Sequence, residues 1–196
     1  MRSTREVSHG RDSVSDEADE AAEIQAARAE RGAFGALYER YRDRVYAYLR
    51  TRTESAEDAS DLMQQVFVRA LDALPGYRGQ PEAFAAWLFQ IARNAAIDHH
   101  RRRRETVAWD LLPEALQPVA VGDLEAAVLR REDVEELHMV LATFDRDTRE
   151  LLALRFAARL SIADTAAVVG KSEAAVKQQL ARTMRRLKER YHDHVR

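Results

Sequence analysis

The stretch SIADTAAVVGKSEAAVKQQLARTMRRL, residues 161–187, decides how the C-terminal part of the chain folds. Ser161 and Asp164 have the spacing of a capping box, in which a hydroxyl caps a helix and an acid follows three residues later. Gly170 is well placed as the left-handed residue that ends this helix, because glycine has no Cβ. Ser172 can cap a second helix. The sequence therefore predicts a helix-turn-helix.

The second of these helices has an apolar side and a basic side. The inward set at three- and four-residue spacing comprises Val176, Leu180, Leu187 and either Met184 or Thr183. On the outer side, Lys and Arg can reach phosphates or guanine, and Gln can bond an adenine edge, so this side is expected to contact DNA. It carries Lys171, Lys177, Gln178, Gln179, Arg182, Arg185, Arg186, Lys188 and Arg190. An ordinary solvated C-terminal helix is the alternative.

Composition indicates that the rest of the chain is helical as well. The 196 residues include only 7 glycines and 4 prolines, and strong helix formers abound. We therefore expect an all-α protein with two small helical domains joined by an extended linker. Zero cysteines exclude disulfides and thiolate metal sites. No apolar run approaches the ~20 residues that span a bilayer, so we expect a cytoplasmic protein without membrane insertion.

The first domain is predicted over residues 16–104, after a polar tail over 1–15 that we expect to be disordered. One helix should span 56–74, where Pro75-Gly76 stops it, and Pro81 should begin another after a short loop. An earlier helix is indicated by apolar residues at three- and four-residue spacing. They are Phe34, Leu37, Tyr38, Tyr41, Val45, Tyr48 and Leu49.

The second domain is predicted over residues 124–196, after a linker over 105–123 in which periodicity fails. Charge follows the same division. Residues 93–104 hold five arginines against one aspartate, and residues 171–196 hold eight Lys/Arg against three acids. Between them, residues 105–150 hold four arginines against twelve acids. Two separate basic blocks suit a protein that touches nucleic acid in two places.

Four consecutive arginines, Arg101–Arg104, end the stretch IARNAAIDHHRRRR. A run of like charge repels itself, so either solvent screens it or a polyanion binds it. Cations also suit the C-terminal end of a helix, so a solvated helix end is the plain alternative. Aromatic groups in the neighbouring segment would suit stacking on unpaired bases. At helical spacing, however, Phe84 and Trp87 more often belong to a core.

Two stretches resemble domains of a known family. ASDLMQQVFVRALDALPGYRGQPEAFAAWLFQIARNAAIDHHRRRR resembles the second domain of bacterial RNA polymerase sigma factors of the extracytoplasmic-function subfamily. FDRDTRELLALRFAARLSIADTAAVVGKSEAAVKQQLARTMRRL resembles their fourth domain, and the two stand in the family's order. The resemblance implies a protein that binds core RNA polymerase and directs promoter-specific transcription initiation, and that is not an enzyme.

The resemblance implies that the second sigma domain binds the clamp helices of the polymerase largest subunit. The family's segment for this contact is here Asp61-Leu62-Met63-Gln64-Gln65, with Gln65 where relatives often have glutamate. The residues expected to bind polymerase are Asp58, Asp61, Gln64 and Gln65.

The same domain is expected to recognise and melt the −10 promoter element. By resemblance, the loop Tyr77-Arg78-Gly79 captures a flipped base, and the arginine run faces duplex phosphates at the upstream edge. Trp87 and Leu88 match the family too, but we interpret both as core. The residues expected to contact −10 DNA are Tyr77, Arg78, Gly79, Gln90, Arg93, Asn94, Arg101, Arg102, Arg103 and Arg104.

The fourth sigma domain is expected to bind the −35 element and to be held by its own region of the polymerase. Relatives often have Gly-Thr where this chain has Ala174-Ala175, and serine where it has Gln178, so their −35 sequence preference does not carry over. The residues expected to contact −35 DNA are Lys171, Ser172, Lys177, Gln178, Ala181, Arg182 and Arg185.

Partners therefore include core RNA polymerase, promoter DNA and, by family habit, an anti-sigma factor. The histidines at 99–100 and 192–194 are poor metal candidates, because adjacent helical histidines diverge and no carboxylate completes a set. We expect no metal, no cofactor and no catalytic residue. Two rival hypotheses stay open: a dimeric helix-turn-helix regulator that binds duplex DNA alone, and a helical interaction protein with no DNA role.

Overall fold

The computed structural model describes residues 9–107, residue 141 and residues 143–194. These residues form helices joined by short turns, with no strand among them. The chain divides into two compact units, Met1–Glu105 and Thr106–Arg196. The all-α expectation is confirmed. Most of the linker predicted over residues 105–123 lies outside the described residues. Its first residues, 105–107, belong instead to the helix Phe84–Val107. Within the described part, no helix is long and apolar enough to cross a membrane.

The first helix, α1 (His9–Ala29), begins earlier than expected. The expectation of a disordered tail over residues 1–15 is wrong for residues 9–15, and residues 1–8 lie outside the described part. The segment carries no apolar periodicity, so the pattern that reveals an amphipathic helix could not reveal this one.

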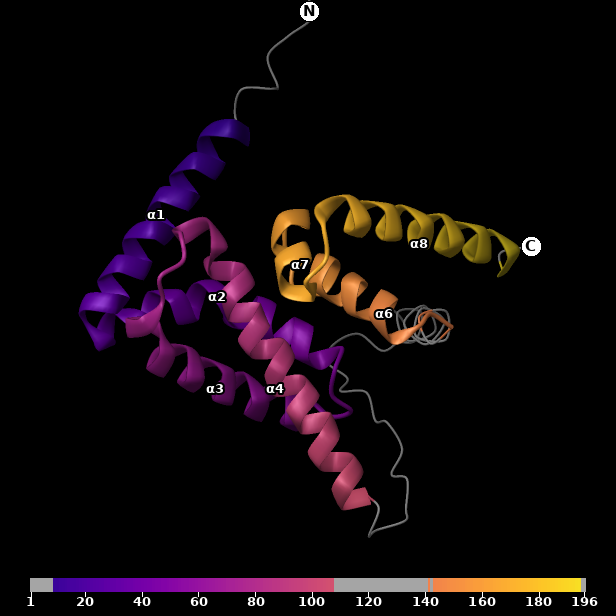
Figure 1. The fold of residues 1–196 in the computed structure, drawn as a ribbon, viewed down its shortest axis with the longest axis horizontal. Coiled ribbons are helices and arrows are strands. Elements are labelled where there is room, and N and C mark those ends of the chain that lie inside the picture. The colour runs from indigo at the N-terminus through magenta and orange to yellow at the C-terminus, as the bar shows by residue number, and fades with distance from the viewer. Residues whose placement is uncertain (1–8, 108–140, 142, 195–196) are drawn as a thin grey trace, which may run out of the picture. The chain divides into compact units, whose positions relative to one another are not determined.

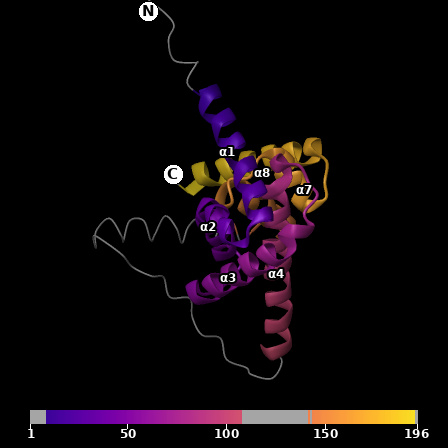
Figure 2. The same cartoon turned by 90° about the vertical axis from the view of Figure 1, so that its left-hand side faces the viewer.

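Three further helices complete the first unit (Figures 1 and 2). They are α2 (Phe34–Arg50), α3 (Ala56–Ala73) and α4 (Phe84–Val107). One 3₁₀ turn, η1 (Arg31–Ala33), lies between α1 and α2. Two more, η2 (Leu74–Gly76) and η3 (Pro81–Ala83), lie between α3 and α4. The predicted stop at Pro75-Gly76 and the start at Pro81 are confirmed. In both views the C-terminal end of α4 runs on beyond α2 and α3.

The core of the first unit contains the apolar faces of α2, α3 and α4. Six of the seven residues expected to face inward from α2 are buried, and Tyr38 is half-buried with its ring 4.7 Å from that of Phe67. Leu88 is buried as expected, whereas Trp87 is half-buried. The other large members from α3 and α4 are Leu62, Val66, Phe67, Phe84 and Phe89.

Polar contacts hold α1 against α2. Glu23 accepts hydrogen bonds from Nε and Nη2 of Arg40 at 2.7 and 3.0 Å, in a half-buried ion pair. The hydroxyl of Tyr41 donates to Glu20, and burial of the ring, with this hydrogen bond, raises the pKa of Tyr41. Because α1 buries little apolar surface beyond Ile24 and Ala27, these charged contacts specify where it docks.

The second unit begins with α6 (Arg146–Leu152), and one π-helical turn, η4 (Ala153–Ala157), follows it. Arg159 has a left-handed backbone with φ +54°, which ends the helix before Leu160. The Nη1 of Arg155 donates to the carbonyl oxygen of Leu160 at 2.8 Å and stabilises this reversal.

The predicted helix-turn-helix is confirmed as α7 (Ile162–Val169) and α8 (Glu173–His194). The Ser161 hydroxyl accepts from the backbone N–H of Asp164 at 3.0 Å. Gly170 ends α7 with φ +67°, the conformation that glycine adopts without strain. The Ser172 hydroxyl accepts from the N–H of Ala175 at 3.2 Å, as an N-cap of α8 should.

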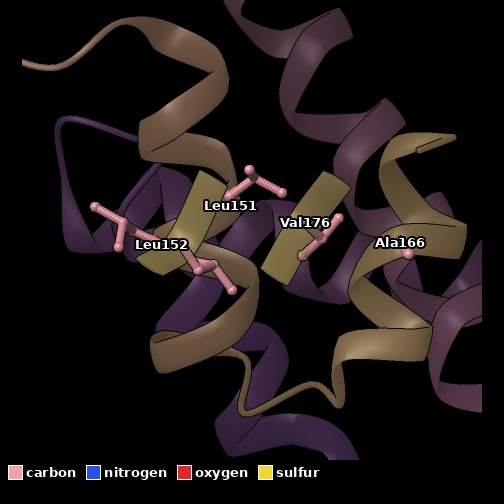
Figure 3. Packing of buried hydrophobic residues seen from close by; sticks show 5 residues of the cluster. Leu151, Leu152, Ala166 and Val176 are labelled. Carbon is pink, nitrogen blue, oxygen red and sulfur yellow. The ribbon is translucent and has the colours of Figure 1, made fainter. Parts of the chain in front are cut away.

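A small apolar cluster joins α6, α7 and α8, and Figure 3 shows four labelled members that converge between the ribbons. The cluster comprises Leu151, Leu152, Ala166, Val176 and Leu180. The structure also decides between the two inward candidates of α8. Thr183 is buried and its hydroxyl donates to the carbonyl oxygen of Gln179 at 2.9 Å, whereas Met184 is 46% exposed.

Candidate nucleic-acid and protein interfaces

The outer face of α3 presents the residues that were expected to bind polymerase. Ser55 caps the helix by accepting from the N–H of Asp58 at 2.9 Å, and this cap fixes where the first turn begins. Asp61, Gln64 and Gln65 are all exposed, in the manner that a docking face requires. Asp58 differs, because its side chain is only 29% exposed and makes an ion pair with Arg103.

Val68 belongs to the same exposed face, although it was not among the residues expected to bind polymerase. It stands four residues after Gln64 and seven after Asp61, so helical geometry places the three side chains in one row. Val68 is 58% exposed, the highest value among the exposed large hydrophobic side chains of the described residues. The spacing from Asp61 was the signal that could have found it.

The loop after α3 is built around a buried tyrosine. Tyr77 is 7% exposed, and its ring lies 5.7 Å from Phe84 and 5.0 Å from Trp87. Its hydroxyl donates to the carbonyl oxygen of Gln80 at 2.6 Å. Burial, with the negative charges of Glu20 and Glu82, raises the pKa of Tyr77. In this structure Tyr77 anchors the loop from inside, and its direct contact with a DNA base stays a prediction.

Gly79 and Arg78 complete this loop from outside. A Cβ on Gly79 would lie 2.6 Å from Cζ and 2.7 Å from Cε2 of Tyr77, far inside van der Waals contact. Only glycine therefore lets the loop close over the tyrosine ring. Arg78 is exposed, and its Nη1 donates to the carbonyl oxygens of Pro75 and Tyr77 at 2.8 and 3.2 Å. The loop is therefore held in shape before any ligand arrives.

One side of α4 continues the surface that was expected to meet −10 DNA. Gln90 and Asn94 are exposed one helical turn apart, and Arg93 between them is half-buried. Arg101 and Arg102 are exposed near the C-terminal end of the same helix. The Nε of Arg102 also donates to the carbonyl oxygen of Asp98, one turn earlier, at 3.4 Å.

Arg103 points away from Arg101 and Arg102. Its Nη2 lies 2.5 Å from Glu54 and its Nη1 lies 3.2 Å from Asp58, across the start of α3. Helical periodicity explains this, because Arg103 continues the inward stripe of Ala92 and Ala96. The structure thus separates Arg103 from Arg101 and Arg102, and its predicted phosphate contact would require both ion pairs to open. Nothing is described of the Arg104 side chain.

The outer face of α8 presents most of the residues that were expected to meet −35 DNA. Gln178, Ala181, Arg182 and Arg185 are exposed. Lys177 is exposed as well and lies 3.6 Å from Glu173, one turn earlier, in a weak surface pair. Beyond them, Arg186 is turned towards the second unit's own core, with its guanidinium carbon 5.3 Å from the centre of the Phe144 ring.

Lys171 and Gln179 are placed differently from the rest of this set. Lys171 Nζ lies 3.7 Å from an Asp147 carboxylate oxygen and donates to Gln179 Oε1 at 3.2 Å. Gln179 is half-buried and its Nε2 donates to the hydroxyl of Thr148 on α6. Ser172 is used as the N-cap of α8. Lys171 and Ser172 lie at the turn of the helix-turn-helix, and Gln179, about two turns into α8, links that turn to α6.

Two family models match the chain, one in each unit. The model of Sigma-70 region 2 matches residues 37–106, which include α2, α3 and α4. The model of Sigma-70 region 4 matches residues 134–187, which include the helix-turn-helix.

Curated relatives match across both units. The chain is 34% identical over 166 residues to the ECF RNA polymerase sigma factor BldN of Streptomyces coelicolor, a match that covers 83% of this chain and 62% of that protein. It is 31% identical over 171 residues to the ECF RNA polymerase sigma factor SigD of Mycobacterium tuberculosis, covering 84% of this chain and 80% of SigD.

A solved structure is similar as well. The sigma factor RpoE of Bartonella quintana, crystallised with the anti-sigma factor NepR, matches with a TM-score of 0.58 and 25% identity. That match covers 80% of this chain and 94% of the RpoE chain.

Proposed function

The chain belongs to the extracytoplasmic-function family of sigma factors, the promoter-directing subunits of bacterial RNA polymerase, and from this premise we propose how its two units divide the work. The first unit docks on core polymerase and opens the −10 element, and the second unit holds the −35 element. The observation that carries the proposal is that the two region matches fall on separate helical units in the family's order.

Docking on polymerase is assigned to the exposed row of α3. Asp61, Gln64 and Val68 offer a carboxylate, an amide and an apolar side chain within two helical turns. A protein interface gains affinity from desolvated apolar contacts and specificity from charge complementarity at their rim. The row supplies both, and its side chains need no rearrangement to be reached.

Opening of the −10 element is assigned to the Tyr77–Gln80 loop and to the adjoining side of α4. Unstacking a base costs a few kcal/mol per step, and a preformed loop loses little entropy when it receives the base. Exposed Gln90 and Asn94 can donate and accept hydrogen bonds along the separated strand. Arg101 and Arg102 neutralise phosphates of the duplex beside it. Nucleotide hydrolysis is not required for this opening, and we infer no catalytic role.

Recognition of the −35 element is assigned to the exposed face of α8. The N-terminal part of a recognition helix contacts base edges, and the residues further along reach phosphates. Gln178 and Arg182 therefore read bases, while Arg185 positions the helix on the backbone. A chain that works as a polymerase subunit acts in the cytoplasm.

An anti-sigma factor is proposed as a further partner. RpoE was crystallised with one, and the exposed rows of α3 and α8 are the surfaces that such an inhibitor would have to cover. The rival hypothesis of a dimeric regulator that binds DNA alone is not favoured, because it gives the match to region 2 no role.

Run-off transcription on a pool of promoter fragments tests the function. Core polymerase with this protein should yield transcripts that core polymerase alone does not, and their shared upstream sequences would define both promoter elements. Holoenzyme that forms without any specific transcript would contradict promoter recognition, and failure to form holoenzyme would restore the regulator hypothesis.

Two variants separate the two units in that assay. Asp61→Arg should prevent holoenzyme assembly while leaving the fold intact, and Asp43→Arg, at a position on α2 that is 91% exposed, is its matched control. Charge reversal at Lys177 and Arg182 should allow assembly but remove dependence on the −35 sequence. Unchanged promoter use by the second variant would show that α8 does not read DNA.

A further inference from the structure

A chain of polar contacts ties the recognition helix α8 to α6. It starts at the turn, where Lys171 Nζ donates to Gln179 Oε1 at 3.2 Å. Gln179 Nε2 then donates to Thr148 Oγ1 at 3.1 Å, and that hydroxyl donates to Asp145 Oδ2 at 3.0 Å. Asp145 is the N-cap of α6 and also accepts from the N–H of Thr148 at 2.8 Å. The chain therefore joins the helix-turn-helix turn to the beginning of α6.

The direction of every hydrogen bond in this chain is fixed by its two ends. An ammonium group can only donate and a carboxylate can only accept, so the Lys171 end and the Asp145 end set the polarity. The Thr148 proton must point at Asp145, which leaves the Thr148 lone pair for the Gln179 amide. Gln179 lies between these ends and is a neutral amide, so its oxygen can accept from Lys171 while its nitrogen donates to Thr148.

Gln179 is less exposed to solvent than its neighbour Gln178. Thr148 is 5% exposed and Gln179 is half-buried, so their hydrogen bond is partly shielded from water. Gln178, one residue earlier, is exposed. A half-buried amide that already uses a donor and an acceptor within the domain is poorly placed to read a base edge.

This inference rests on the proposed −35 role of α8. We propose that Gln179 is a positioning residue for −35 recognition: it fixes the rotation of α8 on α6 through Thr148 and holds Lys171 at the turn, and exposed residues such as Gln178 do the reading. A small rotation of α8 about its axis would carry Gln178 and Arg182 off the bases together. Loss of the positioning contact should therefore weaken every −35 sequence alike.

The test compares variants of the full chain in holoenzyme on a library of −35 elements. Gln179→Met keeps length and volume but removes both hydrogen bonds, and Thr148→Val removes the hydroxyl at constant shape. Each should lower use of all −35 sequences about fivefold, the value of one hydrogen bond, with their ranking unchanged. The double variant should lose less than the product of the two single losses, because both single variants remove the hydrogen bond between Gln179 and Thr148. Thr148→Ser, which keeps the hydroxyl, should retain wild-type use.

Gln178→Met is the matched control, since it makes the same chemical change at the exposed neighbour. It should alter the ranking of −35 sequences at one base position. If Gln179→Met alters the ranking in the same way, Gln179 reads a base and the inference is overturned. Losses that multiply in the double variant, or no loss in either single variant, overturn it as well.

Folding and function remain distinguishable in this design. Thr148→Val removes the same contact from the side of α6, so the positioning role can still be tested if Gln179→Met proves unstable. Thermal unfolding of each variant identifies any that fail to fold. Wild-type holoenzyme that shows no −35 preference would overturn the proposed function itself, whereas a normal preference with multiplying losses would overturn only the positioning role.

Discussion

Arg103 lies 3.2 Å from Asp58, so a residue expected to meet promoter DNA is joined to one expected to meet polymerase. The pair connects the C-terminal part of α4 to the first turn of α3, and Glu54 at 2.5 Å from Arg103 adds a second acid. Because the Arg103 side chain is 41% exposed, the link contributes modestly to stability, about 0.2–1 kcal/mol for each pair. These ion pairs hold the Arg103 side chain on α3, apart from the arginines that we propose contact DNA.

Salt dependence of promoter binding should separate the arginines. Arg101→Gln should reduce the slope of log K against log salt by about one, the effect of one phosphate contact. Arg103→Gln is the matched change and should leave the slope unchanged while lowering the free energy of unfolding by about 0.2–1 kcal/mol for each of the two ion pairs that it loses. Binding of holoenzyme to a labelled promoter at several salt concentrations measures the slope. Equal slopes for the two variants would contradict the assignment of Arg101, but not Arg103, to a phosphate contact.

Gly79→Ala should damage the −10 loop, because the new methyl group would collide with the Tyr77 ring. We expect a loss of about 1–3 kcal/mol in the free energy of unfolding and loss of promoter opening. Gly76→Ala is the control, since a Cβ there meets nothing within 4 Å. Chemical denaturation measures the first effect, and reactivity of unpaired thymines in the promoter measures the second. Equal behaviour of the two variants would show that Tyr77 does not need its present position.

Val68→Asp should weaken holoenzyme assembly, because a carboxylate would replace an apolar group in the proposed contact. We expect a loss of about thirtyfold or more in affinity for core polymerase, because an interface hot spot is worth about 2 kcal/mol or more. The fold should survive, since Val68 is 58% exposed. Ala36→Asp, at an exposed position on α2, is the control. Wild-type affinity of the Val68 variant would remove Val68 from the docking row.

The Asp145 cap should make the second unit sensitive to acid. Hydrogen bonds from the N–H and hydroxyl of Thr148 hold the pKa of Asp145 below its ordinary value. Because the pKa is lower in the folded state, the ionised carboxylate stabilises the fold fully at pH values above its ordinary pKa of about 4. This stability is lost as the pH falls through the folded-state pKa. The stability difference between wild type and Asp145→Asn should therefore shrink as the solution is acidified.

Ser172→Ala provides the comparison for that measurement. It also removes an N-cap, at a cost of about 1 kcal/mol, but through a hydroxyl that does not titrate. Its difference from wild type should stay constant over the same acidic range, measured by chemical denaturation. A difference for Asp145→Asn that is equally constant would mean that the carboxylate charge contributes nothing to the cap.

The sequence by itself determined where the helices of the helix-turn-helix begin and end. Ser161, Gly170 and Ser172 act through their own backbones and near neighbours, so local chemistry was sufficient. The inward face of α2 was readable for a similar reason, because burial follows helical spacing. The early start of α1 was not readable, since residues 9–15 lack an apolar pattern.

Only the tertiary structure decided which exposed-looking polar residues face outward. Arg103, Tyr77 and Gln179 each have a partner that is distant in sequence or hidden within a loop, respectively Asp58, the carbonyl of Gln80 and Thr148. A long polar side chain can reach water or a neighbouring element from the same backbone position, and composition does not distinguish the two. The choice is made by what packs beside it, and that depends on the fold.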